Sequence, residues 1–283
     1  MGISMTDPII VFLGWALGAD RDDKEPIMSK LPKGHSFLDL SDYGRPLALL
    51  IANGLRNTAV SPLHITFSFM VSGLLAVLCM LKGLYVATAL LLIVKSILDA
   101  ADGELARVKK TPSYTGRYFD SVSDIVLNML IFMAIGYITG TDYALTALAF
   151  IGLQLQGTLY NYYYVILRNR HDGDTTSRIF EVTVPTAMPG EQQKNVNALY
   201  RLYRLFYGNF DRIIYSLDPG APLNGRLPNW LMTAVSTFGL GFQLLIIGIM
   251  LVLGMARYII PFFIYYSVFI FIFIGIRRVV SIK

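Results

Sequence analysis

Long apolar segments follow one another along most of the chain and are separated by short polar connections. A helix that crosses a membrane needs ~20 apolar residues, because it rises only ~1.5 Å per residue. Six segments fit this description, although charges lie at one end of the second and third. In chain order they are Pro62–Leu81, a segment from Leu84 toward Lys95 and Asp99, the segment after Asp120 and Asp124 through Ile125–Thr139, Tyr143–Leu167, Trp230–Met255 and Tyr258–Ile276. The pattern predicts an all-α, polytopic membrane helix bundle with about six transmembrane helices.

Two regions lie outside these expected spans. In residues 1–58, the apolar stretch Ile9–Leu17 is too short to span a membrane, and Asp42–Asn57 has the pattern of an interfacial helix. In the insert 169–229, apolar residues recur near helical spacing over Asn197–Leu217, with arginines between them. We favour a membrane-surface helix there over a basic lid that covers a site. The expected regions are 1–58 (N-terminal interfacial segment), 59–168 (first four transmembrane helices), 169–229 (insert with amphipathic helix) and 230–283 (last two transmembrane helices and basic tail).

Two targeting signals, a signal peptide and an N-myristoylation site, concern the N-terminal residues. No basic segment precedes Ile9–Leu17, so we expect no signal peptide there. The opening Met1–Thr6 matches the N-myristoylation pattern, which requires a eukaryotic-type transferase. The sequence leaves open whether Gly2 is acylated.

Composition supports the membrane class. Apolar residues make up 54% of the chain and charged residues 15%, whereas soluble domains have about 45–50% and about 25%. Lysines and arginines that face anionic lipid account for the net charge of +5, so we expect no nucleic-acid partner. The single cysteine, Cys79, lies within an apolar run, which excludes a disulfide framework within this chain and a thiolate metal cluster.

Basic residues concentrate on one side of the expected spans. If the N-terminus is cytoplasmic, the opposite connections carry only Lys82 and Arg257 as basic residues. The inner connections carry Arg107, Lys109, Lys110, Arg168, Arg170, Arg277 and Arg278. The positive-inside rule therefore predicts a multi-pass protein in this orientation.

Four aspartates lie at or beside the ends of the second and third expected spans. Asp99 and Asp102 are three residues apart, and Asp120 and Asp124 are four apart, so each pair shares one face of a helix. The connection 108–115 is short, which predicts two antiparallel neighbouring helices and four converging carboxylates at the cytoplasmic face. Ionisable groups at such positions cost a few kcal/mol each and usually mark function.

Carboxylates gathered in one small volume need cations to balance their charge. Oxygen ligands favour Mg²⁺, Mn²⁺ or Ca²⁺ over zinc, and two such ions ~3.5–4 Å apart suit a phosphoryl-type displacement. Gly103 and Gly116 cost ~1 kcal/mol each inside a helix, so we interpret them as positions where a ligand or another backbone segment approaches the helix closely. Ala106 keeps the same surface narrow, and Arg107 supplies a forked donor for phosphate. The alternative, that the aspartates only mark the ends of helices, does not explain why all four occur together with these glycines and Arg107.

The spacing of these residues resembles a known family signature. The segment Asp99-Ala-Ala-Asp-Gly-Glu-Leu-Ala-Arg107, followed after eight residues by Gly116-Arg-Tyr-Phe-Asp-Ser-Val-Ser-Asp124, resembles the signature of the CDP-alcohol phosphotransferase (CDP-alcohol phosphatidyltransferase) family at all its fixed positions. Ser61–Thr66 is similar to the Thr-Pro-Asn-x-x-Thr stretch that often opens the first helix, although Leu63 stands where Asn is usual. The insert 169–229 has no counterpart in the family's minimal members.

The resemblance implies a cytoplasmic-side active site in which CDP binds beside two divalent cations, Mg²⁺ or Mn²⁺. The implied metal ligands are Asp99, Asp102, Asp120 and Asp124. Asp124 would also be the catalytic general base that takes the proton of the acceptor hydroxyl. The residues implied to line the nucleotide and pyrophosphate pocket are Gly103, Ala106, Arg107, Gly116 and Thr66.

The resemblance covers two subclasses that differ in the donor. Chain length, the number of expected spans and Ser121-Val122 after Asp120, where the eukaryotic CDP-choline type has His-Gly, favour CDP-diacylglycerol as donor and a small polar alcohol as acceptor. The alternative is a CDP-choline or CDP-ethanolamine:diacylglycerol phosphotransferase. Inositol phosphate, glycerol phosphate, serine and an aminoalcohol all stay open as acceptors. Candidate cations for a phosphorylated acceptor are Lys109, Lys110, Arg117, Arg168 and Arg170.

Two further questions concern class and assembly. A cation transporter is a distant alternative, disfavoured because the chain has no transporter-style repeat and because all four acids lie at one membrane face. A homodimer is compatible with the resemblance, since dimers occur in related families.

Overall fold

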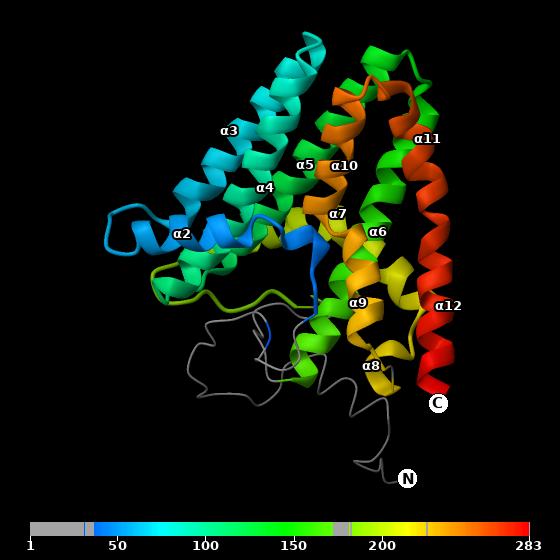
Figure 1. Cartoon of the computed structure of the whole chain (residues 1–283). Coiled ribbons are helices and arrows are strands. Elements are labelled where there is room, and N and C mark those ends of the chain that lie inside the picture. Colours follow the sequence, from blue (N-terminus) through cyan, green and yellow to red (C-terminus); the bar gives the residue numbers. More distant parts are fainter. Residues whose placement is uncertain (1–30, 32–36, 172–180, 182, 225, 283) are drawn as a thin grey trace.

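The structure is a computed structural model that describes residues 31, 37–171, 181, 183–224 and 226–282. Every regular element in these ranges is a helix (Figure 1). The helices are α2 (Arg45–Leu55), α3 (Pro62–Leu81), α4 (Tyr85–Val108), α5 (Tyr114–Thr139), α6 (Tyr143–Arg170), α7 (Gln193–Leu217), α8 (Ala221–Asn224), α9 (Asn229–Val235), α10 (Leu240–Val252), α11 (Ala256–Tyr266) and α12 (Val268–Ile282), with 3-10 turns η1 (Leu40–Asp42) and η2 (Ser236–Phe238). The predictions for Gly2 and for residues 9–17 lie outside the described part of the chain.

Local sequence signals set the ends of the long helices. Pro62 lies in the first turn of α3, where its missing N–H has no helical partner to lose, and Ser61 caps that turn together with His64. Ser113 caps α5 by accepting a hydrogen bond from an amide of the first turn. Gly140 follows α5 at φ 64°, a left-handed conformation that glycine adopts without strain.

The helices α3, α4, α5, α6, α10 and α11 run side by side in one bundle (Figure 1). Helices α4 and α5 each pack against α3, and α10 packs against α4. Gly73 permits the contact of α3 with α5, because a Cβ there would lie 2.8 Å from Leu127 Cδ1. Buried apolar clusters fill the bundle between these helices and, lower down, between α6, α9 and α12.

Length and composition mark three membrane-capable helices in the described part of the chain: α3, α5 and the joined pair Ala256–Ser281. The segments Asn229–Phe238 and Leu240–Val252, bent by 53°, would together make a fourth. The prediction of one continuous helix over Trp230–Met255 is therefore wrong. The backbone is extended at Gly239, where a side chain would collide with Ser41. The count of six spans stays a prediction, because α4 and α6 are too polar to qualify.

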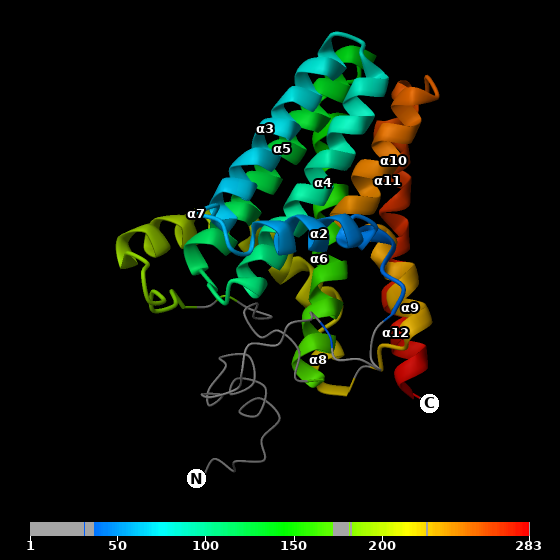
Figure 2. The same cartoon turned by 60° about the vertical axis from the view of Figure 1, so that its left-hand side comes forward.

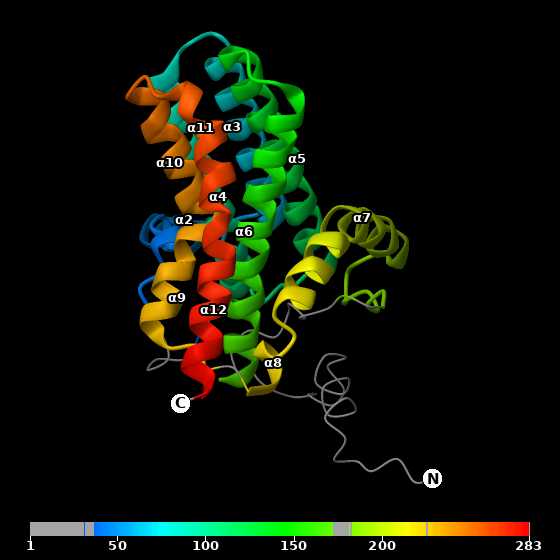
Figure 3. The same ribbon diagram turned by 90° about the vertical axis from the view of Figure 1, so that its right-hand side faces the viewer.

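Two helices lie across the bundle rather than along it. Helix α2 lies within the range expected to be helical, Asp42–Asn57, and α7 contains the whole helix expected over Asn197–Leu217. Both lie at a similar level, on different sides of the bundle (Figures 2 and 3). Their placement at a membrane interface stays a prediction.

Candidate active site

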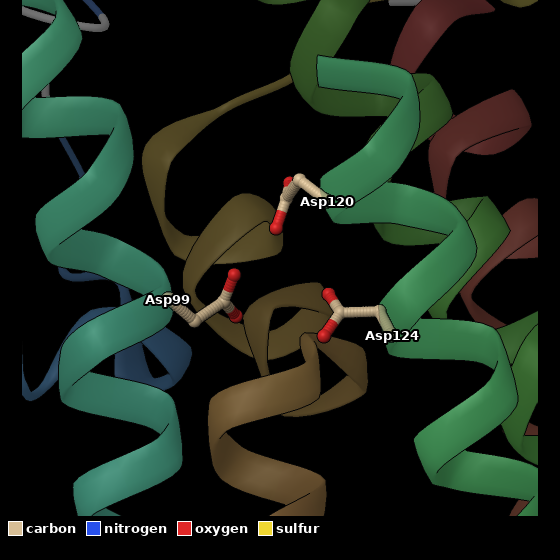
Figure 4. A group of neighbouring side chains, drawn as sticks. All are labelled: Asp99, Asp120 and Asp124. Atoms are coloured by element: carbon tan, nitrogen blue, oxygen red, sulfur yellow. The ribbon is translucent and has the colours of Figure 1, made fainter. Parts of the chain in front are cut away.

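Three of the four predicted aspartates meet in the space between α4 and α5. One carboxylate oxygen from each of Asp99, Asp120 and Asp124 lies within 4.8 Å of the other two. Asp99 comes from α4, and Asp120 and Asp124 come from successive turns of α5, so that all three side chains point toward one another (Figure 4). The four-residue spacing on α5 therefore places both carboxylates on the face toward α4, as predicted.

The chemistry of this aspartate group suits a divalent cation. Oδ1 of Asp120 is buried and has no hydrogen-bond partner among the described residues. The side chains of Asp99 and Asp124 are 24% and 15% exposed, so part of the group is accessible to a ligand. A buried carboxylate oxygen without a partner is costly, and a metal ion is one group that satisfies it. The residues present thus fit a hard cation.

Lys95 pairs directly with the aspartate group, and no role for it was predicted from the sequence. Its side chain is fully buried; the ammonium pairs with Asp124 and lies 3.5 Å from Oδ2 of Asp99. It also lies 4.9 Å from the ring centroid of Phe69. A lysine inside an apolar run and one turn before Asp99 was the available signal. One ammonium against three carboxylates leaves two negative charges uncompensated if all are ionised.

Asp102 is not one of the three aspartates whose oxygens lie within 4.8 Å of one another, and its convergence with them stays a prediction. It is buried, and its Oδ2 accepts a hydrogen bond of 2.7 Å from Oγ1 of Thr66 on α3. Asp102 lies about 60° around α4 from Asp99, on the side toward Thr66 of α3. The structure thus brings Thr66 and Asp102 together beside the aspartate group.

The other predicted pocket residues continue along α4 and into α5. Arg107 pairs with Glu104 at 2.8 Å, and Glu104 also pairs with Arg45 of α2 at 3.1 Å. A Cβ at Gly103 would lie 3.6 Å from the guanidinium of Arg107, and no other described element comes within 4 Å of it. Glu104, which is buried and holds both arginines, was missed because its partner in α2 is remote in sequence.

Two predicted pocket residues have weaker structural support. Ala106 is partly exposed on the same last turns of α4. The amide of Gly116 donates a 2.8 Å hydrogen bond to Oγ of Ser113, which gives this glycine a role in the cap of α5. Their part in nucleotide binding stays a prediction.

The insert is attached to α5 next to the aspartate group. Arg117 forms an ion pair with Glu181, and the hydroxyl of Tyr118 donates to the same carboxylate at 3.0 Å. Farther along α7, the hydroxyl of Tyr207 donates to the carbonyl of Ser121 at 3.0 Å. Helix α7 thus forms a wall beside the turn of α5 that carries Asp120.

The fold and site define an all-helical protein with apolar, membrane-capable helices and a carboxylate site suited to a cation. Residues 59–182 match the family model described as CDP-alcohol phosphatidyltransferase. The chain thus carries a domain of the CDP-alcohol phosphatidyltransferase family, transferases that move a phosphate-containing group from a CDP-linked donor to an alcohol, and the resemblance in the motif is confirmed. The family and the apolar helices both indicate an integral membrane protein. A search of curated proteins gave no match.

Proposed function

We propose that this protein is an enzyme of phospholipid synthesis that transfers a phosphatidyl group from CDP-diacylglycerol to the hydroxyl of a small polar alcohol and releases CMP. The observation that carries the proposal is the aspartate group of Asp99, Asp120 and Asp124 inside the matched domain. The donor rests on the sequence argument from Ser121-Val122 after Asp120. CDP-choline or CDP-ethanolamine with diacylglycerol is the competing pair.

Two divalent cations, Mg²⁺ or Mn²⁺, are the proposed cofactors. Asp99, Asp120 and Asp124 would hold them, with Asp102 as the fourth ligand at the edge shared with Thr66. The unpaired Oδ1 of Asp120 and the excess of carboxylates over ammonium groups support this assignment. When bound, such ions neutralise the charge of the pyrophosphate and of the leaving CMP.

In the proposed reaction, the acceptor oxygen attacks the phosphorus that bears diacylglycerol, and the bond from that phosphorus to the oxygen of CMP breaks. CMP leaves with the electron pair of that bond, and the hydroxyl proton passes to Asp124 as general base. Lys95 would act as a positioning residue, because its buried ammonium pairs with Asp124 and keeps that carboxylate directed between α4 and α5. Thr66, Gly103, Ala106, Arg107 and Gly116 would line the nucleotide side.

Six transmembrane helices, with the aspartates at the cytoplasmic face, complete the proposal. Helices α4 and α6 have 24 and 28 residues, which is enough to span a bilayer. Their polar side chains Lys95, Gln154 and Gln156 are buried within the bundle and do not meet lipid. In a Cys79→Ser background, Lys110→Cys should react with a membrane-impermeant thiol reagent only from the cytoplasmic side. Labelling from the outside would reverse the orientation.

The test of the activity is CMP release by the purified full chain in mixed micelles with Mg²⁺ or Mn²⁺. Each CDP-linked donor is combined with a panel of acceptors. CMP that appears only with CDP-diacylglycerol and a polar alcohol supports the proposal, whereas CMP only with a CDP-aminoalcohol and diacylglycerol reverses the donor. If no pair gives CMP from folded, cation-binding protein, the transferase proposal is wrong and transport becomes the next hypothesis.

A further inference from the structure

The inner face of α7 is built from hydroxyl and carboxyl side chains at helical spacing. Tyr200, Tyr203, Tyr207 and Asp211 follow one another at intervals of three or four residues and so share one side of the helix. Ring contacts fix this side against α5: Tyr118 lies 5.8 Å from Tyr200 and 5.1 Å from Tyr203, between ring centroids. The same side of α7 then continues toward the aspartate group.

Tyr207 is the point at which α7 meets the aspartate group. Its hydroxyl donates to the carbonyl of Ser121, the residue that follows Asp120. Burial, and then the charge of Asp124, raise the pKa of the Tyr207 phenol well above its usual value. The phenol is therefore protonated at neutral pH, and its oxygen can still accept a hydrogen bond from a ligand.

Asp211 lies one turn farther along and has no hydrogen-bond or ion-pair partner in the part of the chain that the structure describes. Its side chain is only partly exposed. Burial raises the pKa of Asp211 to about 7, and the charge of Glu181 adds to this effect, while Arg117 lowers it. Arg117 is itself paired with Glu181 and does not reach Asp211. A half-buried acid without a partner beside a reactive site is a candidate for ligand binding.

Three of the five cations predicted as candidates for a phosphorylated acceptor, Lys109, Arg117 and Arg170, are engaged elsewhere. The ammonium of Lys109 donates to the carbonyls of Thr58 and Val60, both at 2.7 Å. Arg170 donates to the carbonyl of Ala221 at 2.7 Å, and Arg117 is paired as described above. A phosphate monoester carries about −1.5 to −2 charge near neutral pH, so it would meet Asp211 as a like charge.

We propose that α7 forms the acceptor side of the active site, where Asp211 and Tyr207 bind hydroxyl or ammonium groups of a small alcohol that carries no phosphate. The inference rests on the proposed transferase function and names its acceptor class. The donor side lies across the aspartate group, where Thr66, Gly103 and Arg107 are found. An acceptor held by α7 presents its reacting hydroxyl to Asp124 from the side opposite the nucleotide.

Matched pairs of acceptors test the class directly. With CDP-diacylglycerol and Mg²⁺, the purified full chain is offered inositol against inositol phosphate and glycerol against glycerol phosphate, and also serine and ethanolamine. We expect CMP release only with acceptors that lack the phosphate. Turnover confined to the phosphorylated member of a pair overturns the inference while the transferase function stands.

Variants of α7 test the named residues. We expect Asp211→Asn to raise the KM of the acceptor roughly 10- to 100-fold, the loss of a hydrogen bond to a charged group, with metal-dependent CDP binding unchanged. Tyr207→Phe should raise the same KM by less, because a neutral hydrogen bond is weaker. Asn209→Ala, on the exposed side of α7, is the matched control. Wild-type acceptor KM in both Asp211→Asn and Tyr207→Phe overturns the inference.

The same measurements distinguish an ammonium from a hydroxyl as the acceptor group that Asp211 binds. They also distinguish failure of the α7 assignment from failure of the transferase function. A greater loss with serine and ethanolamine than with inositol in Asp211→Asn identifies an ammonium as the group that Asp211 binds, whereas the reverse identifies hydroxyls. If the wild-type chain neither binds CDP with metal nor releases CMP with any acceptor, the transferase function fails and this inference fails with it. If CDP binds and turnover occurs, the α7 variants test only the assignment of α7 to the acceptor side.

Discussion

Two groups of buried charges in this protein differ in how completely their oxygen atoms are paired. Asp218, just after α7, is fully buried; its Oδ1 accepts from Arg277 at 2.5 Å and its Oδ2 from the hydroxyl of Tyr163 at 2.7 Å. The aspartate group of α4 and α5 has one ammonium, that of Lys95, for three carboxylates, and Oδ1 of Asp120 has no partner among the described residues.

The difference separates a structural charge from one that is kept for a ligand. Buried polar groups are normally paired, because an unpaired carboxylate loses its hydration without compensation. The contacts of Asp218 join the end of α7 to α6 and α12 and leave both its oxygens occupied. The aspartate group retains capacity to bind a cation. Pairing, rather than burial, therefore indicates which of the two is the functional site.

The largest effect is expected from Asp124→Asn. The change removes the proposed general base, so CMP release should fall roughly 10²- to 10⁴-fold. The amide has almost the same shape, and the buried Lys95 keeps Asp99 as a counter-ion at 3.5 Å, so the melting temperature in detergent should fall much less than for loss of a sole ion-pair partner, and CDP should still bind. Near wild-type CMP release by this variant would remove the general-base assignment. A large drop in melting temperature would make Asp124 a structural charge like Asp218.

Asp218→Asn should have the opposite profile. The change breaks the ion pair and leaves Arg277 as a buried charge without its counter-ion, which costs about 3–5 kcal/mol. We expect a strongly lowered melting temperature, while the folded fraction keeps its metal-dependent CDP affinity. Unchanged stability with reduced CDP affinity would contradict the comparison and assign Asp218 to the site.

A variant of Lys95 tests whether its ammonium acts on the aspartate group through its charge or serves packing alone. Lys95→Met keeps the length of the side chain but removes the ammonium that pairs with Asp124 and Asp99. Without divalent cations the variant should melt at a lower temperature than the wild type. Because the local negative charge increases, the Mg²⁺ concentration for half-maximal thermal stabilisation should fall by about tenfold. An equal loss of stability at every Mg²⁺ concentration would show that Lys95 serves packing alone.

Sequence signals predicted the elements that depend on local pattern. Helix α3 has the bounds predicted for the first span, because an apolar run lies between Ser61-Pro62 and Lys82-Gly83, which begin and end it. Three aspartates meet because their spacing places them on facing sides of α4 and α5. These features follow from helical periodicity and from residues near each other in the chain.

Tertiary contacts account for what the sequence did not predict. Asp218 and Arg277 are 59 residues apart, and no periodicity links them. The break in the predicted helix Trp230–Met255 depends on Ser41, which approaches Gly239 from η1. The hydrogen bond that Asp102 accepts from Thr66 comes from α3, 36 residues away in the sequence. In each case the deciding partner belongs to a remote element.

Glu191 of the insert is well paired but only partly buried, and it should give the smallest effect. Burial alone would raise the pKa of Glu191, but hydrogen bonds from the amide of Thr115, the amide of Met188 and the hydroxyl of Ser113 lower it overall. A lowered pKa means that the contact stabilises the fold above the ordinary glutamate pKa of about 4.3 and that this stability is lost as the pH falls through the folded-state value.

Glu191→Gln should therefore lower the free energy of unfolding by about 1 kcal/mol at pH 7, and this difference from the wild type should shrink as the pH falls below about 4 toward the lowered folded-state pKa, where the wild-type carboxyl becomes protonated. Melting temperatures of both proteins across that pH range measure the effect, with Glu104→Gln as a buried ion-paired comparison. A difference that stays constant with pH would mean that shape, and not charge, attaches the insert to α5. In that case the degree of pairing alone would not predict how a carboxylate of this protein contributes to stability, and exposure to solvent would have to be weighed with it.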